Sequence, residues 1–591
     1  MTLEELVPEA GNLKSFIEQF DVFAGAPGGV DKIREIILQL AITGRLVSAS
    51  ANDEPVRKVI SDAKSEKISY EKDFNLRKAK AISSLNAENY PYTIPDHWAW
   101  CQLNDLASYI QRGKGPKYTE DNSALVISQK CIQWTGFDIS KARGIENTSL
   151  EKYGKERFLV VGDLLWNSTG TGTVGRIAII ENTYRQSLVA DSHVTVIRLS
   201  NVESRYIWFC IACPWVQLRI DPEHENSLVS GSTKQVELST VAVKELPIPL
   251  PPIEEQKRIV SKVDQLMALC DTLEAQQQQQ AHTVLRANTA AINALLNPNP
   301  QTKENQPETT ETHPNTDPKK QFEQNWQRIA QHFNTLYGCT LPMPKGQGRK
   351  KKHLVGLENI KALRDVIAKL ALNGKLTIRG KDKSISLTKI QESYESWAHT
   401  KKPLKIPPIS LIERDEKIPK NWIYAQLGNI ISIRSGDGLT KAQMEDGNIP
   451  VYGGNGVTGF HSKGNIDTKS IVIGRVGYYC GSVHLTEGLA WITDNAFITN
   501  YPSAYLSKDF LVLLLKNSSL QQNEHSTAQP VISGKKVYPI NVVLPPLEEQ
   551  KRIVAKVDQL MRLCDQLEQQ LTQSYSDAEK LMQATVKALV A

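Results

Sequence analysis

Hydrophobic positions recur with a heptad spacing in one long segment of the chain, and this segment is the best starting point. Its apolar residues are separated by alternating steps of four and three, at Ile259, Val263, Leu266, Cys270 and Leu273. Such a spacing predicts a helix with an apolar seam that packs against another helix. Pro251-Pro252 and the acidic pair Glu254-Glu255 come directly before it, as suits the first turn of a helix.

The same segment occurs again 294 residues later. Pro251-Pro252-Ile253-Glu254-Glu255-Gln256-Lys257-Arg258-Ile259-Val260 returns as Pro545-Pro546-Leu547-Glu548-Glu549-Gln550-Lys551-Arg552-Ile553-Val554. From Glu254 to Met267 the copies differ only at Ser261, which is Ala555 in the second. The second seam consists of Ile553, Val557, Leu560, Cys564 and Leu567. We therefore predict two like helices, at 251–297 and 545–591, that either pair with each other or meet the same partner surface twice.

Each repeated helix follows a segment of a different character. In the first, short runs rich in β-branched residues, such as Val194–Leu199, alternate with loops of Gly, Asn, Ser and Thr. Both segments open with the pattern Ile-Pro-x-x-Trp, at Ile94 and at Ile418, and end in prolines before the helix. We predict two α/β modules, module 1 at 94–250 and module 2 at 418–544.

The remaining segments complete a tandem duplication. Residues 1–93 have a helical rhythm that ends at Gly44, in the position of a C-terminal cap. Leu363–Leu376 echoes this rhythm, so 321–417 is predicted to be a second helical region. Prolines among Thr, Glu and Asn make 298–320 a flexible linker. The predicted fold class is α/β (α+β), with two α/β modules separated by two long helices.

The two halves have diverged unevenly. The helices are nearly the same, while the modules match at few positions, and from Ile94 to Pro251 the first is longer than the second from Ile418 to Pro545. Two like helices with two unlike modules suggest one constant frame that presents two different binding surfaces. Simple helix packing would also preserve a heptad seam.

Composition narrows the functional classes. With 591 residues, 40% hydrophobic and 23% charged, the chain is typical of a multi-domain soluble protein, and a net charge of +6 permits a nucleic-acid partner. Eight scattered cysteines, with no second pair to complete a zinc site beside Cys210 and Cys213, indicate reduced thiols and no metal. No signal peptide or membrane-spanning run is present, so we expect a cytoplasmic protein.

Catalytic motifs give no support for an enzyme. Gly170-Thr171-Gly172-Thr173-Val174-Gly175 fits the dinucleotide fingerprint, but Arg176–Ile180 behind it predicts a strand where that fingerprint needs a helix. Asp191 and His193 are expected to form a local polar contact. We find no phosphate-binding loop, zinc-protease motif, or nuclease or methyltransferase signature. We predict a recognition protein without catalytic residues or a cofactor of its own.

The doubled Leu-Pro-Pro-x-Glu-Glu-Gln-Lys-Arg-Ile-Val helix, at Leu250 and Leu544, resembles the repeated signature of the specificity subunits of Type I restriction-modification enzymes. The Ile-Pro-x-x-Trp patterns, Ile449–Gly456 and Thr493–Phe497 also resemble that family. The resemblance implies that each module is a target recognition domain for one half of a bipartite, asymmetric sequence in double-stranded DNA. It further implies that the two helices form an antiparallel coiled coil that sets the spacer.

The resemblance also implies partners. Two modification (methyltransferase) subunits and two restriction (nuclease and translocase) subunits would join this chain. Adenine methylation from S-adenosylmethionine, and cleavage with ATP and Mg2+, would belong to those partners.

Candidate DNA-contacting residues follow from chemistry alone, because Arg, Lys, Asn and Gln read base edges and polar glycine-bearing loops approach phosphates. In module 1 they are Arg112, Lys114, Lys117, Tyr118, Asn167, Ser168, Thr169, Thr171, Thr173, Lys234 and Gln235. In module 2 they are Arg434, Ser435, Lys441, Asn455, Arg475, Tyr478, Gln529, Lys535 and Lys536. A solvated surface role is the alternative for each of them, and for the basic run Arg349-Lys350-Lys351-Lys352.

Two rival functions stay open at this point. The modules could bind proteins on a helical scaffold, in which case binding would depend less steeply on salt than phosphate contacts do. Alternatively, the chain could modify DNA unaided, against which the missing cofactor motif counts.

Overall fold

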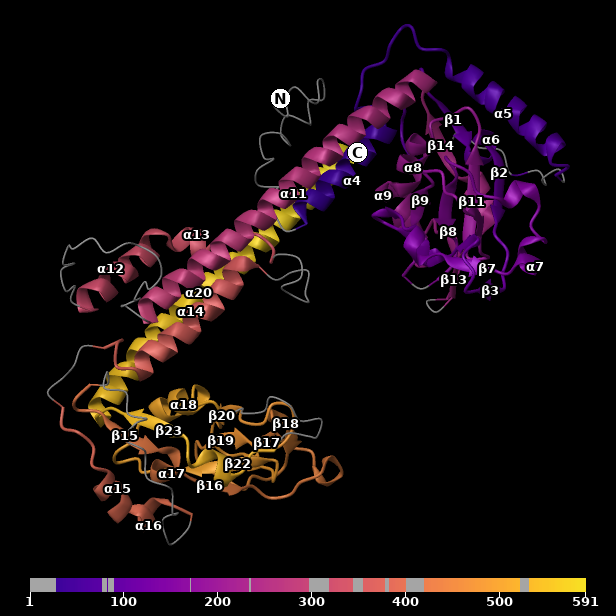
Figure 1. Ribbon diagram of the computed structural model, residues 1–591. Helices are drawn as coiled ribbons and strands as arrows, with labels where there is room; N and C mark the ends of the chain where they lie inside the picture. Colours follow the sequence, from indigo (N-terminus) through magenta and orange to yellow (C-terminus); the bar gives the residue numbers. More distant parts are fainter. Residues whose placement is uncertain are drawn as a thin grey trace, which may run out of the picture. The chain divides into compact units, whose positions relative to one another are not determined.

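The two long helices lie where the heptad pattern predicts them. The computed structural model describes residues 28–76, 82, 90–170, 172–232, 235–296, 318–343, 354–377, 382–399, 419–520 and 531–590. In it α11 spans Ile253–Leu296 and α20 spans Leu547–Val590, each 44 residues long (Figure 1). The predicted seam residues are buried, apart from Leu273, Leu560 and Leu567, which are half-buried. At ~1.5 Å per residue each helix is about 66 Å long.

The chain divides into two compact units that each take a part of both long helices. One unit comprises residues up to Gln280 together with those from Tyr575 onward, and the other comprises Ala281–Ser574. The start of α11 thus lies with the end of α20, and Met582 joins the apolar cluster of Val263 and Leu266. The start of α20 lies with the end of α11 in the other unit. This arrangement confirms the predicted antiparallel pairing.

A third helix lies against each pair and ends in the same way. These helices are α4 (Gly29–Ile42) and α14 (Val355–Leu372). Gly44 and Gly374 follow them with φ of 72° and 67°, the left-handed conformation that favours glycine. A Cβ at Gly44 would come within 2.4 Å of Pro95, and one at Gly374 within 2.7 Å of Pro419. The predicted cap at Gly44 is confirmed. Each of the two glycines lies against the proline and the tryptophan of an Ile-Pro-x-x-Trp pattern, so the cap and the pattern occur together in both halves.

Module 1 begins and ends in neighbouring strands. β1 (Ala99–Gln102) pairs antiparallel with β14 (Pro247–Leu250), so the Trp98 pattern and the Pro251-Pro252 pair lie side by side. One four-stranded sheet has the order β2-β11-β8-β9 and the other β10-β4-β7-β3. Their bounds are β2 Ala107–Arg112, β3 Tyr118–Thr119, β4 Ala124–Ile127, β7 Arg143–Ile145, β8 Leu164–Asn167, β9 Ile177–Ile179, β10 Ser187–Ala190 and β11 Val194–Leu199.

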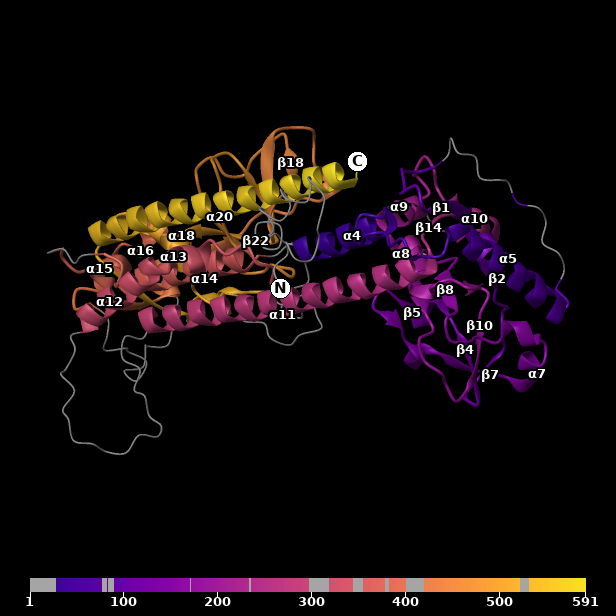
Figure 2. The same ribbon diagram turned by 90° about the horizontal axis from the view of Figure 1, so that it is seen from above.

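Two hairpins and several helices complete module 1. The hairpins are β5 (Ile132–Gln133) with β6 (Gly136–Phe137), and β12 (Val229–Ser232) with β13 (Gln235–Leu238). α5 (Val56–Asp73) precedes the module and lies along β2 (Figure 2). The helices inside the module are α6 Leu103–Leu106, α7 Asn147–Leu150, α8 Ser204–Ala212, α9 Pro214–Gln217 and α10 Thr240–Glu245.

Module 2 repeats this plan. β15 (Ile423–Gln426) pairs antiparallel with β23 (Asn541–Leu544), as β1 does with β14. Its sheets have the orders β16-β22-β19-β20 and β18-β17-β21. Their bounds are β16 Ser432–Ser435, β17 Ile449–Gly453, β18 Gly456–His461, β19 Ile471–Gly474, β20 Val483–Leu485, β21 Trp491–Ile492 and β22 Ala496–Asn500. The predicted fold class, a tandem duplication of α/β modules with two long helices, is confirmed.

The remaining helices lie mostly in the central region and in module 2. They are α12 Pro318–Gln331, α13 Phe333–Tyr337, α15 Leu387–Glu392, α16 Tyr394–Trp397, α17 Leu427–Ile430, α18 Lys508–Lys516 and α19 Gly534–Val537. The last residue of the first predicted helix, Asn297, residues 298–317 of the predicted linker, Ile418 and the basic run 349–352 lie outside the described residues. Among the helices of the described ranges, we find none with the length and apolar character to span a membrane.

The repeated signature forms a joint between module, third helix and long helix. The Glu255 side chain is buried and accepts a hydrogen bond of 3.1 Å from the Trp98 indole. Gln256 is also buried, accepts from the Glu203 backbone N–H at 2.9 Å and donates to the Pro251 carbonyl at 2.9 Å. Arg258 pairs with Asp53 at 2.7 Å. The two long helices have kept the same residues at these positions because their side chains bond to other segments of the same chain.

The second joint repeats the glutamine and arginine contacts, whereas the Trp422 indole and the Glu549 Oε1 have no hydrogen-bond partner among the described residues. Gln550 accepts from the Ser507 N–H at 2.8 Å and donates to the Pro545 carbonyl at 2.9 Å. Arg552 pairs with Asp382, as Arg258 does with Asp53.

Replacing Gln256 by Ala is expected to lower the free energy of unfolding by about 2–4 kcal/mol, because the buried Pro251 carbonyl loses its partner at a cost of about 1–3 kcal/mol and the partly buried Glu203 N–H loses a hydrogen bond worth about 1 kcal/mol. Gln550→Ala should have the same effect on module 2. Urea unfolding followed by tryptophan fluorescence measures both. Lys257→Ala, at an exposed neighbouring position, is the control and should change little. Equal stabilities of Gln256→Ala and Lys257→Ala would show that the joint does not depend on this amide.

Candidate nucleic-acid interface

A glycine-rich loop lies at the same place in both modules. It joins β8 to β9 in module 1 and β19 to β20 in module 2. Gly170 and Gly175 have φ of 106° and 89°, and Gly477 and Gly481 have 100° and 88°. Because β8 and β9 pair antiparallel, the segment that resembles a dinucleotide fingerprint is a turn between two strands. The prediction of a strand behind it is confirmed, and no helix N-terminus follows these glycines to receive a pyrophosphate.

Each loop is held from one side by a later segment. The Leu238 N–H donates to the Ser168 carbonyl at 2.8 Å, and the Ile532 N–H donates to the Arg475 carbonyl at 2.9 Å. In module 1 the later segment is β13, whose Glu237 pairs with Arg112 at 2.8 Å. Arg112 also donates to the Leu238 carbonyl at 2.9 Å. Arg112 therefore ties the end of β2 to β13, and these bonds fix the loop's backbone.

Three of the predicted module 1 residues are exposed close to one another along the chain. They are Lys114, Lys117 and Tyr118. The Lys114 ammonium donates to the Lys152 carbonyl at 2.9 Å. The Arg143 guanidinium lies 3.9 Å from the centre of the Tyr118 ring, a cation–π contact. These residues form a basic and aromatic surface beside β3.

Asn167 and Ser168 lie inside the module, although the sequence analysis predicts that they contact DNA. Both side chains are fully buried. The Asn167 amide donates to the carbonyls of Gln129 and Thr173, and the Ser168 hydroxyl lies 2.5 Å from that of Thr195. They shape the loop and present no exposed atom to a ligand. Sequence reasoning missed this because Gln129 and Thr195, which help to bury these side chains, come from other elements of the module.

The remaining residues of this loop make local contacts. The Thr169 hydroxyl bonds the His193 ring at 2.6 Å, and the Thr173 hydroxyl donates to Gln129 at 2.8 Å. Asp191 accepts from the His193 backbone N–H at 2.8 Å. Burial raises the pKa of the Asp191 carboxyl, and that hydrogen bond opposes the rise. The Asp191–His193 contact is thus local, as predicted.

In module 2, Arg475 occupies a bridging position. Its guanidinium donates to the Ser435 hydroxyl at 3.1 Å and the Asp494 carbonyl at 3.2 Å, and lies 5.6 Å from the centre of the Phe497 ring. Arg434, Lys535 and Lys536 are exposed. Thr171, Lys234 and Gln529 lie outside the described residues, as does the side chain of Gln235.

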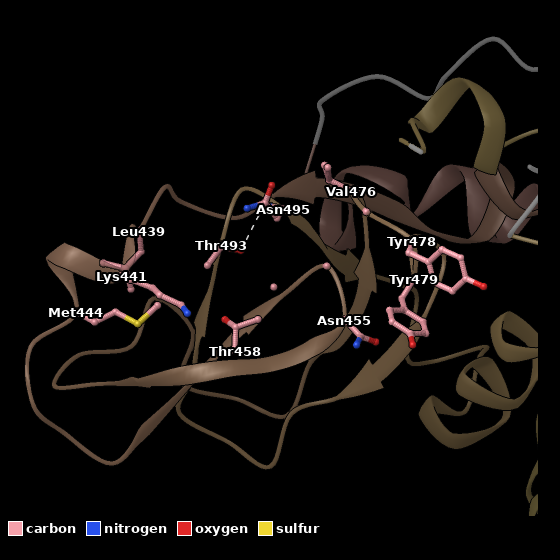
Figure 3. Close-up of a pocket in the computed structure, with 13 residues that line it drawn as sticks. Leu439, Lys441, Met444, Asn455, Thr458, Val476, Tyr478, Tyr479, Thr493 and Asn495 are labelled. Atoms are coloured by element: carbon pink, nitrogen blue, oxygen red, sulfur yellow. Dashed lines mark hydrogen bonds between the residues drawn. The ribbon is translucent and has the colours of Figure 1, made fainter. Parts of the chain in front are cut away.

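Three predicted residues from different elements of module 2 meet at one cavity of about 340 Å3, the module 2 cavity. They are Lys441, Asn455 and Tyr478, and the Lys441 side chain points into the space between them (Figure 3). Thr493, Asn495 and Tyr479 also line it and were not predicted as site residues. Asn495 corresponds to His193, since the backbone carbonyl of each accepts a hydrogen bond of 2.9 Å from the N–H of the first residue of the glycine loop, Arg475 or Ser168. Only the fold places these segments together.

Metal-binding chemistry is not evident at this surface. In the part of the chain that the structure describes, no three His, Cys, Asp or Glu side chains gather as metal ligands would. Cys210 and Cys213 are buried in the core of module 1. Burial raises the pKa of the Cys213 thiol to about 12, so it stays protonated at neutral pH.

Comparisons with a family model and with known proteins all give the same family. The family described as "Type I restriction modification DNA specificity domain" matches residues 95–283 and 419–574. The Type I restriction enzyme EcoEI specificity subunit of Escherichia coli is 24% identical over 589 residues, covering 92% of this chain and 91% of that protein. The EcoAI specificity subunit, also of Escherichia coli, is 25% identical over 585 residues, covering 91% and 90%.

Solved structures also match. A chain from a study of complex assembly and conformational transition of the type I R-M system has a TM-score of 0.46 at 16% identity, covering 85% of this chain and 99% of that one. The HsdS subunit from Thermoanaerobacter tengcongensis has a TM-score of 0.39 at 16% identity, covering 85% and 98%.

Proposed function

Since this chain belongs to the specificity subunits of Type I restriction-modification enzymes, we propose that its two modules read the two halves of a bipartite, asymmetric site in double-stranded DNA. The observation that carries this proposal is that both modules have one frame with different loops. Thr169-Gly170 in module 1 stands where module 2 has Val476-Gly477. A constant frame with variable loops suits two readers of different sequences.

The paired long helices would set the spacer between the half-sites. Each is a continuous helix of 44 residues whose two ends belong to different compact units. A helix of this length is a stiff element with a fixed rise per residue. The number of residues between the joints would therefore decide how many base pairs lie unread.

Two modification subunits would dock on the repeated helices. Leu269 and Leu563 lie at the same repeat position and are 45% and 50% exposed. The position before them has changed from Ala268 to Arg562, whereas the leucine has stayed. One identical apolar side chain on each unit fits two copies of one partner. The chain itself is the non-catalytic component, and S-adenosylmethionine, ATP and Mg2+ would act in the modification and restriction subunits.

Mapping methylated bases tests the proposal. DNA from methylation-free cells that express this chain with its modification subunit should carry one bipartite motif. Exchanging residues 423–544 for the corresponding module of the EcoAI relative should change one half of the motif and leave the other half intact. The exchange runs from β15 to β23, so it replaces the module between its two paired end strands. Methylation without sequence preference, or a motif unaffected by the exchange, would contradict the proposal.

A further inference from the structure

The two modules differ at the connection between two equivalent strands. β4 and β7 in module 1 correspond to β17 and β18 in module 2, because each first strand pairs parallel with a later strand and antiparallel with its successor. In module 2 a tight turn at Gly454-Asn455 connects them. In module 1 the connection is residues 128–142 and contains the β5–β6 hairpin. This insertion accounts for part of the extra length of module 1.

The insertion covers the glycine loop of module 1. Gln129 accepts a hydrogen bond from the Thr173 hydroxyl at 2.8 Å, and its backbone carbonyl accepts one from the Asn167 amide at 3.2 Å. Gln133 accepts from the Arg176 guanidinium at 2.8 Å. The corresponding space in module 2 has no such cover, and there the module 2 cavity opens between Asn455 and the loop of Tyr478. The cavity is therefore lined by the tight turn that stands in module 2 where module 1 has its insertion.

Three polar side chains at the cavity make no hydrogen bonds to other described residues of the protein. The amides of Asn455 and Asn495 and the ammonium of Lys441 are exposed. Within the described residues these three side chains have no hydrogen-bond partner. Gly453, Gly454 and Gly477 form part of the wall, so backbone and ligand can approach closely. Convergent unpaired amides beside a cation and a glycine wall are suited to a nucleotide.

Two adjacent tyrosines border the cavity. Tyr478 is 85% exposed and Tyr479 is 51% exposed, and their rings pack edge to face with centroids 5.0 Å apart. In Figure 3 the Tyr479 ring lies next to Asn455, while Tyr478 points outward. Such large exposed aromatic surface, held on a turn between Gly477 and Gly481, gains free energy when a sugar or base covers it.

We propose, on the premise that module 2 reads DNA, that this cavity is its base-reading site and that its base is adenine. The Asn455 and Asn495 amides face a base edge, and an amide offers the donor and acceptor that match N7 and N6–H of adenine. Lys441 contacts a phosphate and the two tyrosines pack on the neighbouring sugar. Module 1 reads its half-site through the exposed residues around Tyr118.

The test uses this chain assembled with its modification subunits. The dissociation constant is measured for the mapped site and for sites in which each adenine of the second half is replaced by guanine. Asn455→Ala and Asn495→Ala should each reduce discrimination at one adenine by about 10- to 100-fold, with no change at the first half-site. Asn455→Asp keeps the shape but loses the donor, so it should discriminate against adenine. Tyr478→Ala should weaken binding to both forms of the site alike.

A matched control lies at the other end of β17. Asn448 is exposed before β17, about 16 Å along the strand from Gly453 of the cavity at ~3.3 Å per residue. Asn448→Ala should leave the preference unchanged. A wild-type complex without a bipartite site would overturn the proposed function itself. A bipartite site that both asparagine variants read with full discrimination would overturn the cavity assignment alone.

Discussion

Inserting one heptad into each long helix is expected to lengthen the unread DNA spacer by about three base pairs. Seven residues add about 10.5 Å to a helix, and B-DNA rises about 3.4 Å per base pair. The insertion points are between Gln280 and Ala281 and between Ser574 and Tyr575, which are equivalent positions where the chain passes from one compact unit to the other. Seven residues keep the spacing of the apolar seam, so the helices can still pair. Mapping methylated sites reads the spacer directly.

A four-residue insertion within Gln276–Gln280 of α11 alone is the comparison. It adds about one turn but breaks the phase of the seam against the unchanged α20. We expect this variant to change the spacer and also to unfold more easily. An unchanged spacer in the double heptad variant, with methylation intact, would show that the helices do not set the distance.

The constant parts of the fold could be predicted because they depend on local sequence. The seam from Ile259 to Leu273 repeats with the helical period, and Gly44 marks a helix end that any side chain with a Cβ would strain. The strand behind Gly175 followed from Ile177–Ile180. Each of these features depends only on residues that are close in the sequence. The tandem repeat also shows each of them twice.

The site could be predicted only in part, because its chemistry depends on long-range contacts. Lys441, Asn455 and Tyr478 were chosen separately by residue type, and only the fold brings them to one cavity. Asn167 and Ser168 were also chosen by residue type, but they are buried by an insertion and by β11. Asn495 was not chosen as a contact, although it lies in the Thr493–Phe497 stretch that resembles the specificity subunits, and it sits in a turn after β21. Its role depends on the turn's place beside the glycine loop.

The function of the repeated signature was also only partly predictable from the sequence. Its identity in both halves suggested a surface for partners, but Glu255, Gln256 and Arg258 make bonds within the chain. Conserved charge and polarity on a helix can therefore reflect a joint between segments. The residues left to bind identical partners are the exposed ones that the two helices share, and Leu269 with Leu563 is the largest apolar pair among the described exposed residues.

Replacing Leu269 by Glu is therefore expected to leave the complex with one modification subunit in place of two. Burying a leucine in an interface contributes about 1.5–3 kcal/mol, and a glutamate there must also be desolvated. Leu563→Glu should lose the other copy, and the double variant should lose both. Native mass spectrometry of the assembled complex counts the subunits in each case.

Leu581 provides the matched control for this count. It is 42% exposed on α20, and the equivalent position of α11 is Ala287, so it belongs to no repeated surface. Leu581→Glu should retain two modification subunits. Two subunits bound to the double variant would place docking elsewhere on the chain. Loss of a subunit in Leu581→Glu would show that any charge on these helices weakens the assembly, because the effect would then follow exposure and not the repeat.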